Sequence, residues 1–175
     1  RLDLFQTAVE SYEAKDYQNA IAQFKEYLAK VDRDHPHVEE AMMKLAIIYK
    51  RTGHPENYAK ILKSLTRYRK ASRQFPYNPR WMYELARFHW NQEQISMTTH
   101  YLKQLIRWPF HGYAGQSYFI MAKIEAENHR YKQALSYLIK ASAYVMDEDK
   151  QEEIAYLKGW YAYKIKDHQR AITAF

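Results

Sequence analysis

The densest group of possible metal ligands in this sequence surrounds Pro36. His35 and His37 flank the proline, and Asp32 and Asp34 precede it. Imidazole and carboxylate groups are ligands that zinc accepts. Because the proline turns the two imidazoles apart, we interpret the segment as a solvated connector in which Asp34 or His35 caps the next helix. We therefore expect no metal site here.

The sequence lacks the motifs of common enzyme chemistry. It contains no G-x-x-x-x-G-K, G-x-G-x-x-G, H-E-x-x-H or G-x-S-x-G, the signatures of phosphate, dinucleotide, zinc-protease and hydrolase sites. None of the 175 residues is cysteine, which excludes disulfides and thiolate metal centres. We predict a protein that is not an enzyme and that has no cofactor and no small-molecule substrate.

The positive charge of the chain is concentrated in one segment. The net charge is +7, from 27 basic and 20 acidic residues, and residues 57–83 include seven basic residues and no acidic one. Five of the seven follow a helical spacing and would share one face. We interpret this face as solvated surface or as a docking surface for an acidic protein, with nucleic acid or an anionic membrane as less favoured partners. This basic stripe consists of Lys60, Lys63, Arg67, Lys70 and Arg73.

The chain carries no apolar run of 18 residues and no basic-then-apolar leader, so we expect no membrane span and no export signal in it. It begins at Arg1 rather than at methionine, and a leader could have been removed. We expect a soluble protein, cytoplasmic or periplasmic.

One sequence pattern recurs along the chain. Residues 16–24 return as residues 167–175 and, less closely, as residues 130–138. With the preceding segments aligned as well, the period is about 36–40 residues, which indicates stacked helical units. Predicted caps are Asp16, Asn78, and Asp147 or Asp149. We predict ten helices in five pairs, at 2–14, 17–31, 36–51, 55–73, 79–90, 95–108, 112–127, 131–146, 150–165 and a last one cut off at 175.

Small residues recur at one position of each pair, where close crossing would require them. The first-helix slot holds Ala8, Ala46, Ala86, Ala122 and Gly159, and the second-helix slot holds Ala20, Ala134 and Ala171, followed by Phe24, Leu138 and Phe175. In these features the chain resembles the tetratricopeptide repeat family. The second and third pairs depart from the pattern at Tyr58 or Ala59 and at Thr98.

The resemblance implies an all-α, right-handed solenoid of antiparallel helix pairs. It would form a single domain with repeats at about 1–35, 36–75, 78–110, 112–148 and 149–175, as a fragment of a longer protein. It also implies a scaffold that binds a peptide or protein partner in a concave groove lined by the first helices. The Lys, Asn and Arg residues with which some members clamp a chaperone tail are absent from the matching positions, Phe5 and Val9, which disfavours that partner.

The expected groove residues lie one helix face away from the small slot. Many are aromatic, and aromatic side chains offer large contact area at low entropic cost. Two alternatives to the scaffold remain open: an RNA-binding helical-repeat module, and a regulatory arm of an enzyme whose catalytic domain lies elsewhere. The groove residues are Phe5, Val9, Tyr12, Met43, Ile47, Tyr83, Arg87, Trp90, Phe119, Lys123, Tyr156, Trp160 and Tyr163.

Overall fold

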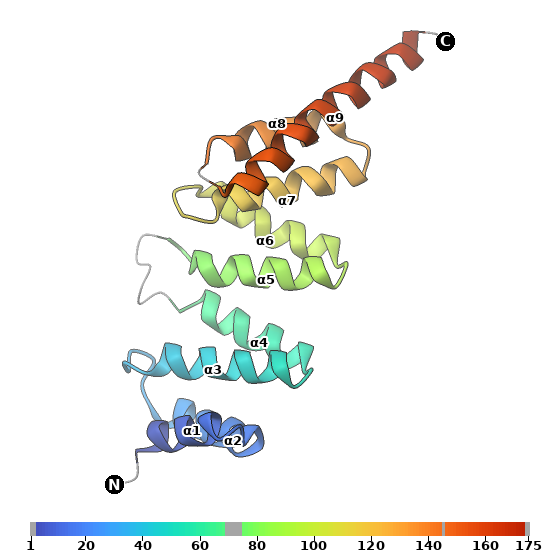
Figure 1. The fold of residues 1–175 in the computed structure, drawn as a ribbon. Helices are drawn as coiled ribbons and strands as arrows, with labels where there is room; N and C mark the ends of the chain where they lie inside the picture. The colour runs from blue at the N-terminus through green and yellow to red at the C-terminus, as the bar shows by residue number, and fades with distance from the viewer. Residues whose placement is uncertain (1–2, 69–74, 145, 174–175) are drawn as a thin grey trace. The chain divides into compact units, whose positions relative to one another are not determined.

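A computed structural model describes residues 3–68, 75–144 and 146–173. In these ranges the chain forms nine helices and no strand, which confirms the all-α class (Figure 1). The chain divides into two compact units, Arg1–Leu85 and Ala86–Phe175, with the boundary inside the fifth helix. The helices are α1 Leu4–Glu13, α2 Tyr17–Lys30, α3 Val38–Arg51, α4 Pro55–Thr66, α5 Pro79–Asn91, α6 Ile95–Arg107, α7 Ala114–Glu127, α8 Tyr131–Ser142 and α9 Glu148–Thr173.

Three predicted caps are present at helix starts. The side chains of Asp16, Asn78 and Asp147 each accept a hydrogen bond from a backbone amide two or three residues further on, at 3.3, 3.2 and 2.8 Å. These bonds satisfy amide groups that have no partner within the helix. None of the helices in the described ranges is long and apolar enough to cross a membrane.

The core of the first unit forms where α1 packs on α2, α2 on α3 and α3 on α4. Ala8, Ala20 and Phe24 have no exposed surface, and the ring of Phe24 lies 6.2 Å from that of Phe5. Small residues at the crossing let the two helix axes approach closely. The same core includes Tyr27, Ala41, Leu45, Ile48 and Tyr49.

The second unit repeats this arrangement, with α6 packed on α7, α7 on α8 and α8 on α9. Ala122, Ala134 and Leu138 are fully buried. Thr98, which occupies a small slot, is also fully buried, and its hydroxyl donates to the carbonyl oxygen of Gln94 at 3.0 Å. That bond satisfies the buried hydroxyl. The core continues through Tyr118, Phe119, Ala141, Met146, Ile154 and Tyr161.

A single left-handed residue makes the turn inside each of the first four helix pairs. The φ angles of Lys15, Gly53, Glu93 and His129 are 60°, 71°, 57° and 58°. At Lys166, which aligns with Lys15, α9 instead continues as one helix of 26 residues. The predicted break, and with it the count of ten helices, is therefore wrong for the described residues. Residues 160–173, around the predicted break, contain neither Gly nor Pro. A continuous helix avoids the cost of about 1–2 kcal/mol for a non-glycine residue in the left-handed conformation.

We expect Ala20→Leu and Ala134→Leu each to destabilise the protein. Both alanines are fully buried at crossings, and added methylenes there cost about 1–3 kcal/mol through overpacking. Thermal unfolding followed by circular dichroism measures the effect. Ala29→Leu, at an exposed position of α2, is the matched control and should unfold like the wild type. Unchanged unfolding of both core variants would contradict the close crossing.

Candidate protein-interaction surfaces

The predicted groove residues that precede the small slot by three positions differ widely in exposure. Phe5 and Phe119 belong to the cores, at 7% and 5% exposed, whereas Tyr156 is 72% exposed. Met43 and Tyr83 are half-buried. The first two rings therefore offer a partner little area, because their own units already cover them.

The groove residues directly after the small slot are more accessible. Ile47 and Trp160 are 38% and 42% exposed, and Arg87 is exposed as well. Val9 and Lys123 are half-buried. The next positions of the row hold Tyr12 and Trp90, both half-buried, and Tyr163, which is 54% exposed.

A hollow of about 190 Å³ lies in the first unit and includes two predicted groove residues. Its wall is apolar where Met43, Ile47 and Leu62 line it, and its polar groups come from Lys50, Arg80 and Glu84. Ligand pockets for small molecules usually exceed roughly 300 Å³. The hollow therefore suits one anchoring side chain of a larger partner. Ala46, Tyr58 and Trp81 complete its lining.

Aromatic rings hold the two cations of this hollow in place. The Arg80 guanidinium carbon lies 4.6 Å from the centre of the Trp81 ring, and Lys50 Nζ lies 6.0 Å from that of Tyr58. Trp81 in turn donates its indole N–H to Glu39 at 3.4 Å. Stacked cations of this kind keep their charge at the rim while their stems cover apolar surface.

The neighbouring face of α1 and α3 is also covered by cations. Lys44 Nζ lies 4.5 Å from the centre of the Tyr12 ring and 3.7 Å from a carboxylate oxygen of Glu40. Arg51 donates to the Tyr17 hydroxyl at 3.2 Å. The predicted groove residue Tyr12 thus already has an intramolecular partner.

In the second unit, two lysines cover Phe119. The Nζ atoms of Lys123 and Lys150 lie 4.7 and 4.4 Å from the ring centre. Both also reach Glu153 on α9, at 2.8 and 3.2 Å. The hydrogen bond from Lys123 is the main cause that holds the pKa of Glu153 below its ordinary value, with Lys150 adding to it against the opposing effect of burial.

α9 presents three large aromatic residues to solvent. Tyr156, Trp160 and Tyr163 are spaced four and three residues apart, so they share one side of the helix, and their exposed fractions are 72%, 42% and 54%. The rings of Trp160 and Tyr163 stack at 5.7 Å. Lys164 Nζ lies 4.8 Å from the Trp160 ring centre. Here the predicted groove residues are brought together and remain accessible.

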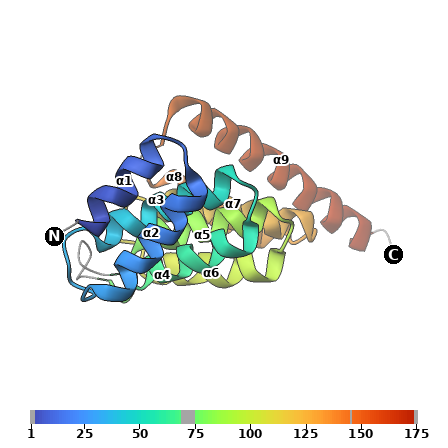
Figure 2. The same ribbon diagram turned by 90° about the horizontal axis from the view of Figure 1, so that it is seen from below.

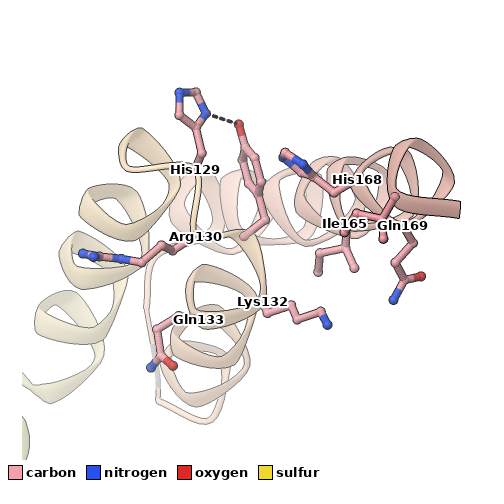
Figure 3. Close-up of a pocket in the computed structure, with 9 residues that line it drawn as sticks. His129, Arg130, Lys132, Gln133, Ile165, His168 and Gln169 are labelled. Atoms are coloured by element: carbon pink, nitrogen blue, oxygen red, sulfur yellow. Dashed lines mark hydrogen bonds between the residues drawn. The ribbon is translucent and has the colours of Figure 1, made fainter. Parts of the chain in front are cut away.

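A second hollow lies between the start of α8 and the distal half of α9, with a volume of about 450 Å³. No predicted groove residue lines it. Figure 3 shows Ile165 and His168 from α9 on one side of this hollow and His129 and Lys132 on the other. The Tyr131 hydroxyl is 3.3 Å from His129 Nδ1. The rings of Tyr131 and His168 are 5.9 Å apart. Ile172, which also lines the hollow, is 76% exposed.

The basic stripe is only partly within the described residues. Lys60 and Lys63 are exposed on α4, and Arg67 is exposed at the residue that ends this helix. Lys70 and Arg73 lie outside the described residues. The sequence predicted that this helix continues to residue 73, but α4 ends at Thr66. Residues 69–74 lie outside the described residues.

Residues from elsewhere in the first unit act on the two residues that follow α4, Arg67 and Tyr68. Burial raises the pKa of Tyr68, and Glu39 and Asp34 raise it further. Arg33 donates to the carbonyl oxygen of Arg67 at 3.5 Å. Two acidic residues distant in sequence thus act on Tyr68, the residue after Arg67, which the local composition did not indicate.

The histidines around Pro36 have other partners. His35 Nδ1 is 2.5 Å from the Tyr27 hydroxyl, and the His37 ring stacks on Phe5 at 4.3 Å. Among the described residues no group of three possible ligands could hold a metal ion. His37 precedes α3 and makes no capping bond through its side chain, so the expectation that Asp34 or His35 caps this helix is wrong.

One exposed apolar loop was missed from the sequence. Trp108 and Phe110, between α6 and α7, are 46% and 82% exposed. His111 anchors the loop: its Nε2 lies 2.9 Å from the Leu105 carbonyl oxygen, and its Nδ1 accepts from the Tyr113 amide at 3.1 Å. Burial lowers the pKa of His111, which favours the neutral ring that this bonding requires. Pro109, between the two aromatic residues, was the sequence feature that could have indicated this exposed loop.

Comparison with solved structures identifies the fold. One putative kinesin light chain with TPR-like repeats from Podosopora anserina matches with a TM-score of 0.57 and 15% identity, over 97% of this chain and 89% of that one. The MamA protein matches at 0.61 and 13%, over 97% and 85%. PilF of Pseudomonas aeruginosa matches at 0.59 and 14%, over 97% and 71%. No family model and no curated protein matches the sequence. The chain therefore has the helical-repeat fold of tetratricopeptide-like proteins, which confirms the predicted resemblance at the level of fold.

We expect Glu153→Gln to lower the melting temperature by about 1–2 °C at pH 7, because it removes two partly exposed ion pairs. Since the pKa of Glu153 is lowered in the folded protein, the stabilisation is complete above the ordinary value of 4.5 and is lost as the pH falls below it. Thermal unfolding at pH 7 and pH 3 measures the difference, which should shrink in acid.

Glu152→Gln, which alters an exposed carboxylate at the adjacent position of α9, is the matched control. It should leave the melting temperature unchanged at pH 7. An effect of Glu153→Gln that is equal at both pH values would contradict the ion-pair interpretation.

Proposed function

We propose that this chain is a non-catalytic scaffold that binds a peptide or protein partner on the first-helix face of its repeats. The hollow of the first unit carries the proposal. It joins the predicted groove residues Met43 and Ile47 to an apolar wall, with Lys50 and Arg80 at the rim. This arrangement suits a bulky apolar anchor next to an acidic residue.

The basic stripe has a supporting role in this proposal. Exposed charges change the rate of encounter more than they change final affinity, and salt screens them. Lys60 and Lys63 are exposed on α4, the helix from which Tyr58 and Leu62 line the hollow. The stripe would steer an acidic partner, and the hollow would select it.

An RNA-binding role is disfavoured by the placement of the rings. Recognition of single-stranded RNA uses exposed aromatic side chains interleaved with basic ones. Tyr58 on α4 is half-buried, and Tyr68, two residues after the end of α4, is buried. The described part of the stripe therefore offers charge without an exposed stacking platform.

The anchor hollow is tested by selecting peptides from a random display library on the wild-type chain. We expect selected peptides to share a bulky apolar residue flanked by acidic ones. Ile47→Asp should weaken their binding by about thirtyfold, as for loss of an interface hot spot of about 2 kcal/mol. Ile139→Asp, the same change at an exposed isoleucine of α8, is the control and should bind normally. Equal binding by Ile47→Asp would contradict the proposal.

The stripe is tested on the same peptides by measuring association rates at low and moderate salt. We expect Lys60→Glu with Lys63→Glu to slow association about tenfold at low salt and much less at moderate salt, with little change in dissociation rate. Lys103→Glu with Arg107→Glu, two exposed basic residues of α6, is the control pair. Similar slowing by both pairs would mean that net charge, and not the stripe, steers association.

A further inference from the structure

α9 is apolar on two opposite sides. Ile154 and Tyr161 on one side are 4% and 3% exposed and belong to the core of the second unit. Tyr156, Trp160 and Tyr163 lie on the other side and remain exposed. A helix that is apolar on both sides normally has neighbours on both. The exposed side, which we call the aromatic face of α9, consists of these three residues.

The Tyr156 position of this face is covered in two other repeats. Tyr156 aligns with Phe5 and Phe119, which are 7% and 5% exposed. Gly159, at the edge of the face, aligns with Ala122, which is fully buried, yet a Cβ atom on Gly159 would meet nothing within 4 Å. Tyr156 is thus a ring of the kind that other repeats cover, and beside Gly159 a second helix could approach the backbone closely.

Charge along α9 is divided between its two halves. Residues 148–160 include four acidic residues and two basic ones, and residues 161–173 include three basic residues and one acidic residue. An antiparallel pair of such helices places each acidic half opposite a basic half, whereas a parallel pair places like charges together. Charge patterns of this kind set the orientation of paired helices.

Symmetry agrees with this orientation. An antiparallel pair centred between Gly159 and Trp160, near the middle of Glu148–Thr173, overlaps over residues 148–171, about 36 Å. Tyr156 of one copy then lies opposite Tyr163 of the other, as a twofold axis requires. In Figures 1 and 2 the distal half of α9 extends past α7 and α8, which leaves this half accessible.

We propose that two copies of this chain associate through the aromatic face of α9, antiparallel, with the two Trp160 side chains at the centre. This self-association is separate from peptide binding in the first unit. It covers the six exposed rings of the two copies and places the net acidic half of each α9 opposite the net basic half of the other, with Glu152 opposite Asp167 as the exception. Salt should weaken the dimer, since part of the attraction is between exposed charges.

The proposal is tested on the full 175-residue chain by sedimentation equilibrium over a concentration series. The wild type should form dimers, and Trp160→Gln should raise the dimer dissociation constant at least about tenfold. Trp108→Gln is the matched control, because Trp108 is an equally exposed tryptophan outside α9. Circular dichroism confirms folding, and Tyr156→Gln gives a second variant of the face. A monomeric wild type, or a dimer that these variants do not weaken, would overturn the proposal.

Orientation is tested by disulfide formation, which the absence of native cysteine makes unambiguous. In the antiparallel pair, position 152 lies opposite position 167. Copies of Glu152→Cys alone, or of Asp167→Cys alone, would hold their cysteines about 22 Å apart, beyond the roughly 7 Å that a disulfide spans. We expect a mixture of the two variants to form disulfide-linked dimers and neither to do so alone. Efficient linkage of either variant alone would indicate a parallel pair and overturn the proposal.

Discussion

The close crossing of paired helices at alanine is the interaction on which the structure depends. Ala8, Ala20, Ala122 and Ala134 have no exposed surface, and each allows a neighbouring helix to approach until bulky residues interlock beside it. Phe24 and Leu138, four residues after the second-helix alanines, are likewise fully buried. Once the crossing is set, the other faces of each helix have determined neighbours.

This geometry explains why equivalent residues have different roles. Phe119 and Tyr156 occupy the same position of successive repeats, yet α9 contributes Lys150 and Glu153 to the cover over Phe119, and nothing of that kind covers Tyr156, which is 72% exposed. A ring at this position is core when the following helix packs over it. It is surface when no helix does so within the described chain.

Cations shape the surfaces that the crossings leave open. Lys44, Lys123 and Arg80 each lie over an aromatic ring, at 4.5, 4.7 and 4.6 Å. Such contacts are worth about 0.5–1 kcal/mol at exposed sites. A partner that binds one of those rings must displace the cation or form an ion pair with it. The two surfaces for which we propose a partner, the hollow beside Ile47 and the exposed ring of Tyr156, are therefore not identified by a list of aromatic positions.

The helical class and the caps at Asp16 and Asn78 were predictable from the sequence, and Asp147 was one of two residues predicted for its cap, because these features depend on residues within a few positions of each other along the chain. The tertiary structure alone decided which groove residues are accessible and whether α9 breaks at Lys166. The spacing of residues along a helix predicts which of them share a face. Whether that face is covered, and whether a left-handed turn is compensated by burial, depends on helices brought together from distant parts of the sequence.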